Sequence, residues 1–288
     1  MKKNTNLLNT VGLILSFLAF SSPIYATEND KEQSASEMKM DHSAHKESQG
    51  PTIKVDVLPL KDIKKGEAQS IKIKLTSLKD DKAILLSDLK EAHTKKIHVL
   101  IFDASLTDYQ HVHPEPTKEE GIYQFDWEPK KEGTYRLWVD VVPLKTGQEE
   151  YIRADLANVG KDSNSVDKTL NLNGKVGDNW YTLAFDAESL KKGQAAMGTI
   201  KVVDAQGHDF KALEPIMGAY AHIVAVNEDF ETIAHVHPMG DEPSKEDDRG
   251  GPLLKFHFEP EKSGYYKIWL QAQIGGKDVY VPFGVNVE

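Results

Sequence analysis

The chain has 288 residues with 45 acidic and 35 basic side chains, a formal net charge of -10 at pH 7. This charge argues against nucleic acid as a partner, because a polyanion binds basic surfaces. Cysteine is absent, which excludes disulfides, thiolate zinc sites, a cysteine nucleophile and a blue-copper centre.

The N-terminus has the pattern of a cleavable secretory signal. Lys2 and Lys3 precede an apolar stretch over residues 7–20, and a short segment ends at Ala26 before the chain turns polar. The pattern predicts a signal peptide over residues 1–26 and therefore a periplasmic or secreted protein. The apolar stretch is shorter than the roughly 20 residues of a spanning helix, so we expect no membrane span in the mature chain.

A polar segment, residues 27–51, follows the signal. Its apolar side chains are limited to Ala and Met, so it cannot bury a core and we expect a disordered arm. The arm places two thioethers and two imidazoles within eight residues, and such tracts can capture copper without folding. These candidate additional ligands are Met38, Met40, His42 and His45.

Beyond the arm the sequence has β character. Apolar and polar residues alternate in short runs such as 52–57 and 71–75, and no long stretch has a helical period. About seven short strands in each half predict an all-β fold of two tandem immunoglobulin-like β-sandwiches. Trp138 and Trp269 are the expected aromatic anchors of the two cores. The expected boundaries are repeat 1 at 52–160, a polar linker at 161–178 and repeat 2 at 179–288.

The two halves are copies of one unit. His98 lies 13 residues before a His-Val-His-Pro motif at 111–114, and His222 lies 13 residues before a second copy at 235–238. Matching positions are 124 residues apart before the loop at 240–251 and 131 apart after it. An insertion in that loop explains the difference, since surface loops tolerate added residues.

The repeated histidines have the spacing of metal ligands. In an extended strand, the two imidazoles of His-Val-His project from one face about 7 Å apart. The lone His in the preceding strand could meet them across a hairpin. Three neutral imidazoles on a rigid sheet suit Cu(II) or Zn(II) and leave an open position. We therefore predict sites for copper, with zinc as the alternative, at His98, His111 and His113 in repeat 1 and at His222, His235 and His237 in repeat 2.

Repeat alignment also places His93 opposite Met217, five residues before each lone His. Both residue types bind copper, although Met217 is equally explained as a packing side chain in a loop.

The six repeated histidines could instead form a hydrogen-bonded cluster that fixes the contact between the domains and senses pH. His208 fits a turn and His257 is not shared by the repeats, so we assign neither to a site.

No phosphate loop, nucleophile elbow or HExxH helix is present in the sequence, so we expect a non-enzymatic protein. Two alternatives stay open. One is a structural or protein-interaction module whose histidines are core or interface residues. The other is a metalloenzyme with an open three-histidine site.

Segments 215–226, 235–238 and 264–269 resemble a group of exported bacterial proteins with YtkA-like, immunoglobulin-fold domains. The resemblance covers both repeats and implies a periplasmic or cell-surface location and an association with copper handling. As a partner we expect a membrane or periplasmic copper-handling protein. Repeat 1 departs from the group by having His93-Thr94-Lys95-Lys96 where a Gly-Ala type turn is usual, so the two sites need not be equivalent.

Overall fold

The computed structural model describes residues 50–161, 165–236, 238–240 and 242–288. The predicted signal peptide and the Met/His arm up to residue 49 lie outside the described residues. The described residues belong to one compact unit. They form β-strands and one short 3-10 helix, η1 (Leu86–Asp88). Among the described residues there is no helix that is long and apolar enough to cross a membrane.

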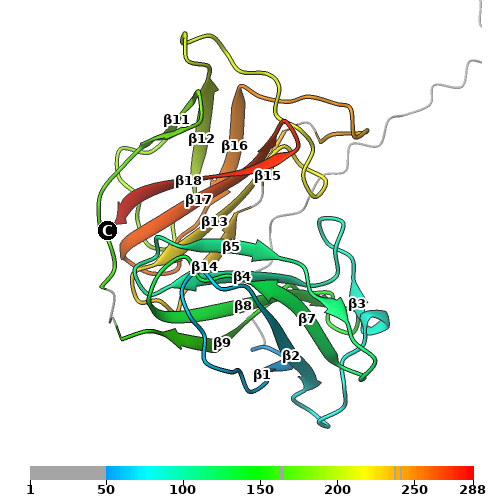
Figure 1. Ribbon diagram of the computed structural model, residues 1–288. Helices are drawn as coiled ribbons and strands as arrows, with labels where there is room; N and C mark the ends of the chain where they lie inside the picture. The colour runs from blue at the N-terminus through cyan, green and yellow to red at the C-terminus, as the bar shows by residue number, and fades with distance from the viewer. Residues whose placement is uncertain (1–49, 162–164, 237, 241) are drawn as a thin grey trace, which may run out of the picture. The chain divides into compact units, whose positions relative to one another are not determined.

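The first repeat is a sandwich of two antiparallel sheets (Figure 1). Its strands are β1 (Ile53–Val57), β2 (Gln69–Ser77), β3 (Leu89–Lys90), β4 (His98–Asp103), β5 (Tyr109–Val112), β6 (Glu115–Pro116), β7 (Ile122–Trp127), β8 (Gly133–Pro143) and β9 (Glu150–Val159). One sheet has the order β1-β2-β7-β6, and the other joins β5, β4, β8 and β9, with β3 paired to the end of β8. This is the ABED and C′CFG arrangement of the immunoglobulin fold.

The second repeat has the same topology. Its strands are β10 (Asn173–Val176), β11 (Asn179–Phe185), β12 (Ala196–Val203), β13 (His222–Asn227), β14 (Ile233–Val236), β15 (Pro238–Met239), β16 (Leu253–Phe258), β17 (Gly264–Ile274) and β18 (Lys277–Val287). The sheets have the orders β10-β11-β12-β16-β15 and β14-β13-β17-β18. The all-β prediction of two immunoglobulin-like sandwiches is therefore confirmed.

One extra strand differs from the sequence prediction. β10 falls within residues 161–178, which the sequence indicates as a linker, and it pairs with β11 through a tight turn. It is an edge strand in which exposed and half-buried residues alternate. An edge strand needs few apolar residues, so the polar composition of this segment did not reveal it.

Each sandwich has its own hydrophobic core. The core of the first repeat draws on β2, β7 and β8, with Ile73, Trp127 and Leu137 fully buried. The core of the second repeat draws on β12, β16 and β17 in the same way. The alternation of buried and exposed residues along β2 and β16 confirms the period-two pattern of the sequence.

A third buried cluster joins the two repeats. Along β4, Val99 and Ile101 belong to the first core, whereas Leu100 and Phe102 belong to a cluster that also contains Val224 of β13. β4 and β13 are therefore buried on both faces. This explains why the four residues after the leading histidine of each strand, 99–102 and 223–226, are all apolar.

Trp138 and Trp269 lie in this third cluster and not in the sandwich cores, which corrects the expectation from sequence. Trp138 packs edge to face on Phe230 of the other repeat, with ring centroids 5.9 Å apart. The Nε1 of Trp269 donates to the carbonyl oxygen of Leu106 at 3.3 Å. Composition cannot tell the two faces of a sheet apart when both are covered.

Candidate metal centre

Three histidines of the first repeat meet on the face of the sheet that is turned away from the first core. In the β4/β5 hairpin Val99 pairs with Val112 and Leu100 with His111. His98 precedes Val99 on β4 and His113 follows Val112. Because side chains alternate between the two faces of a strand, both histidines lie on the same face as Leu100 and His111. The register of the hairpin thus brings together the three ligands predicted for repeat 1.

The ring nitrogens are at ligation distances from one another. His98 Nδ1 lies 3.1 Å from His111 Nε2 and 3.2 Å from His113 Nε2. One nitrogen from each of the three rings lies within 4.8 Å of the others. Tetrahedral ligation with metal–nitrogen bonds of about 2.0–2.1 Å separates two nitrogens by about 3.3 Å. The three-histidine group therefore has the dimensions of a metal site.

Hydrogen bonds fix the tautomers of two of these imidazoles. His98 Nε2 is 3.0 Å from the carbonyl oxygen of Ala92, which only accepts, so this nitrogen carries the proton. His111 Nδ1 is 2.9 Å from Oε1 of Gln271. The Gln271 amide is oriented because its Nε2 donates to the Asp278 carboxylate at 3.0 Å, so its oxygen faces His111, whose Nδ1 therefore donates.

The two nitrogens that face each other, His98 Nδ1 and His111 Nε2, then both present lone pairs. Lone pairs 3.1 Å apart repel unless a cation lies between them, and the cation is either an added proton or a metal ion. A histidine ligand whose other ring nitrogen donates to a fixed oxygen is the usual arrangement at protein metal sites. The hydrogen-bond pattern therefore supports metal binding in addition to the distances.

The surroundings also keep two imidazoles of the group, those of His111 and His113, neutral. Burial, followed by the neighbouring His113 and His98, holds the pKa of His111 well below its usual 6.5. Burial, followed by His98 and Lys95, lowers the pKa of His113 to about 4. Neutral imidazole is the form that binds a metal, so both side chains are available as ligands at neutral pH.

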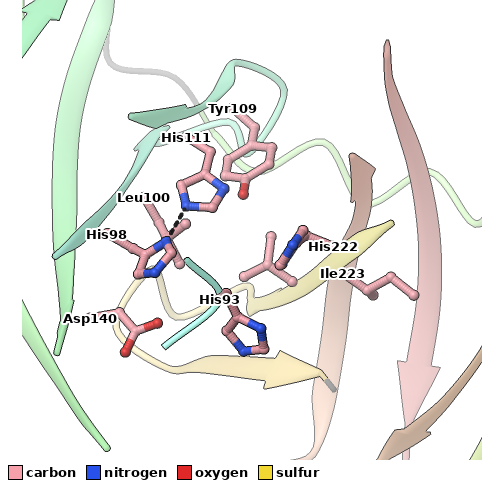
Figure 2. A pocket seen from close by; sticks show the side chains of 9 residues that line it. His93, His98, Leu100, Tyr109, His111, Asp140, His222 and Ile223 are labelled. Atoms are coloured by element: carbon pink, nitrogen blue, oxygen red, sulfur yellow. Dashed lines mark hydrogen bonds between the residues drawn. The ribbon is translucent and has the colours of Figure 1, made fainter. Parts of the chain in front are cut away.

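Four imidazoles surround one small pocket beside this group (Figure 2). In order around the pocket, the ring centroids are 5.3 Å apart for His98–His111, 6.2 Å for His111–His222, 5.2 Å for His222–His93 and 6.2 Å for His93–His98. His222 belongs to the second repeat. Asp140, a buried carboxylate on β8, lines the same pocket.

His93 reaches the pocket from a tight turn. Its repeat partner is Met217, and both residues have a positive φ, 49° and 50°. In each repeat the residues before and after the turn form a bridge, Ala92 with Lys95 and Ile216 with Ala219. The sequence alignment of His93 with Met217 therefore corresponds to the same turn in each sandwich.

The second repeat repeats part of the site. His222 is 4% exposed, and its Nε2 lies 3.1 Å from the carbonyl oxygen of Ile216, as His98 Nε2 lies near Ala92. The backbone of His235 pairs with Val224 in the β13/β14 hairpin. The His235 side chain and His237 lie outside the described residues, as do the arm ligands Met38, Met40, His42 and His45. Met217 is half-buried and is not among the residues that line the pocket.

Sequence reasoning missed Gln271 and Asp278, which orient His111, and Asp140, which lines the pocket. A signal was present, because Gln271 pairs with His222 on the neighbouring strand as Asp140 pairs with His98. Each is a polar side chain in a strand that is otherwise largely apolar. The contact of Gln271 with His111 crosses between repeats, and a sequence alone does not indicate such a contact.

No curated protein sequence matches this chain. Among solved structures, the D00-D0 domain of Intimin is 12% identical over 80% of this chain and 98% of that one, with a TM-score of 0.23. MtrC from Shewanella baltica OS185 is 6% identical over 82% of this chain and 70% of its own, with a TM-score of 0.25. The ICAM-5 D1-D4 ectodomain fragment is 10% identical over 82% of this chain and 53% of its own, with a TM-score of 0.21. Scores this low carry no argument about the site.

A family described as a domain of unknown function, DUF8832, matches residues 46–159 and again residues 174–288. The two matches coincide with the two sandwiches and agree with the internal repeat that the sequence predicts. Because they cover most of the chain, the protein belongs to the DUF8832 family and contains its domain twice.

Proposed function

We propose that this protein is an exported metal-binding protein that sequesters or delivers copper, with zinc as the alternative ion. The observation that carries the proposal is the convergence of His98, His111 and His113, two of which are held as the tautomers that present lone pairs to each other. In a cluster of exposed histidines without a function, we would not expect fixed hydrogen-bond acceptors on the ring nitrogens that point away from the site.

Four features of the sequence support copper and export. The chain has no cysteine, so imidazole and thioether are its available soft or borderline ligands. The arm at 27–51 combines Met and His, and the first 26 residues have the pattern of a secretory signal. The resemblance to YtkA-like exported modules points to the same role, and a membrane or periplasmic copper-handling protein is the partner that such a role requires.

We further propose that His222, His235 and His237 form the corresponding set in the second repeat. The proposal rests on their spacing and on the hydrogen bond of His222 to a turn carbonyl, which matches that of His98. Since the chain offers no nucleophile motif, we assign storage or transfer of an ion and no catalysed reaction.

A structural role is the second candidate, because His111 also hydrogen-bonds Gln271 across the contact between repeats. On this view the histidines join two sandwiches and bind no ion. A ligand that binds only the folded state raises stability, so addition of Cu(II) or Zn(II) leaves the melting temperature unchanged if this candidate is correct.

The test is titration of the mature protein with Cu(II) and Zn(II) by calorimetry and native mass spectrometry. A variant with His111, His113, His235 and His237 changed to Ala should lose the bound ions. The matched control changes His208 and His257, two exposed histidines outside the cluster, to Ala and should keep them. Equal binding by all three proteins would remove the site assignment.

A further inference from the structure

The side chain of His93 lies closer to the histidine of the other repeat than to that of its own. Its ring centroid is 5.2 Å from His222 and 6.2 Å from His98. The ring of four imidazoles in Figure 2 therefore divides into two close pairs, His98 with His111 and His93 with His222. The second pair combines one residue from each repeat.

Both close pairs have the ring-centroid separation that ligation to one ion requires. With metal–nitrogen bonds of about 2.0–2.1 Å, two imidazoles at a tetrahedral ion have centroids about 5.2 Å apart. The His93–His222 distance is 5.2 Å with the ring planes at 87°. Pairs at 6.2 Å would need an angle at the metal of roughly 150°, far from tetrahedral.

The electronic state of His222 suits a ligand. Its Nε2 lies 3.1 Å from the carbonyl oxygen of Ile216 and so carries the proton, which leaves the lone pair on Nδ1. The ring is buried, with 4% of its surface exposed. Asp140, a buried carboxylate in the same pocket, supplies negative charge that offsets a cation.

The turn that presents His93 is conformationally costly. Both of its central residues, His93 and Thr94, have positive φ, 49° and 65°. This conformation is unfavourable for a β-branched residue such as Thr94. Such strain persists where surrounding structure enforces it, and it concentrates at functional sites. Repeat 2 has the permissive Gly218 at the position of Thr94, so repeat 1 carries a cost that its copy avoids.

We propose that His93 and His222 hold a second metal ion, the same ion that is proposed above for the second repeat, so that this ion bridges the two repeats. The inference deepens the proposed function and rests on it for the class of ion, a divalent metal that prefers imidazole, Zn(II) or Cu(II). The bridge makes His93 a ligand of the second repeat although it belongs to the first.

The test is Zn(II) titration of the mature protein by native mass spectrometry and competition calorimetry. His93→Asn removes the imidazole with a residue that tolerates positive φ. His93→Met keeps a side chain that the equivalent turn already holds at φ 50° but replaces nitrogen by a thioether, which is poor for zinc. We expect both variants to weaken a second Zn(II) by about 10-fold or more, since loss of even an outer partner costs 10–100-fold.

The outcomes separate this inference from the proposed function. The first Zn(II), bound at His98, His111 and His113, should keep its affinity in both variants. If the second ion binds both variants as tightly as it binds the parent protein, or is lost only with His222→Asn, the bridge is wrong and the three-histidine site stands. If the parent protein binds one ion only, the bridge also fails. If it binds none, both proposals fail.

Discussion

Gln271 should control metal affinity at a site to which it contributes no ligand. Its Oε1 accepts from His111 Nδ1 at 2.9 Å, while its Nε2 donates to Asp278 and to the Tyr280 hydroxyl, each at 3.0 Å. Gln271→Met keeps the shape of the side chain but removes the acceptor. Loss of such an outer partner typically lowers metal affinity 10–100-fold, which corresponds to about 1.4–2.7 kcal/mol.

The same substitution leaves a buried N–H of His111 without its acceptor, so we also expect the metal-free protein to lose about 1–3 kcal/mol of unfolding free energy. Affinity is measured by zinc competition and stability by denaturant unfolding with chelator present. The matched control is Gln273→Met, two residues along β17, which contacts Asp278 at 3.3 Å and leaves His111 untouched. Zinc affinity of Gln271→Met within twofold of the parent protein would refute the idea that this bond orients His111.

Three further predictions concern stability and processing. The folded-state pKa of His113 is lowered to about 4 from 6.5, so between these pH values the unfolded chain binds more protons than the folded one. The metal-free protein should therefore lose stability as the pH falls from 6.5 to about 4. Unfolding in chelator at several pH values measures this loss, and a flat profile contradicts it. Trp138→Ala should cost about 3–5 kcal/mol of unfolding free energy, as large buried aromatics do, whereas replacing the exposed Trp180 should cost far less. On expression in a bacterium, the exported chain should begin at Thr27, which intact mass of the periplasmic fraction would reveal; retention of Met1 there would count against the signal peptide.

The β4 histidine and the His-Val-His motif could be combined from sequence because β-strands have a fixed period and hairpins a fixed register. His98, His111 and His113 follow from those two rules alone. Gln271 and the approach of His93 to His222 could not be predicted, because both depend on how two sandwiches pack. The same reason explains the misplacement of Trp138, since burial against a core and burial against a neighbouring domain leave the same apolar signature.

The contact between the sandwiches has the reciprocity of an isologous dimer. Leu106 and Phe230 occupy equivalent turns with positive φ, and Leu106 receives a hydrogen bond from Trp269 as Phe230 receives the ring of Trp138. Such an interface is self-complementary, so a relative with one domain should form a symmetric homodimer. Joining two copies in one chain frees them from that symmetry.

That freedom is visible around the pocket, where one copy contributes His93 and the other Met217, and where Asp140 on β8 has Gln271 as its counterpart on β17. A homodimer would have to change both halves at once. The fused pair can keep a carboxyl in one half and an amide in the other, and so tune the two proposed ion positions separately.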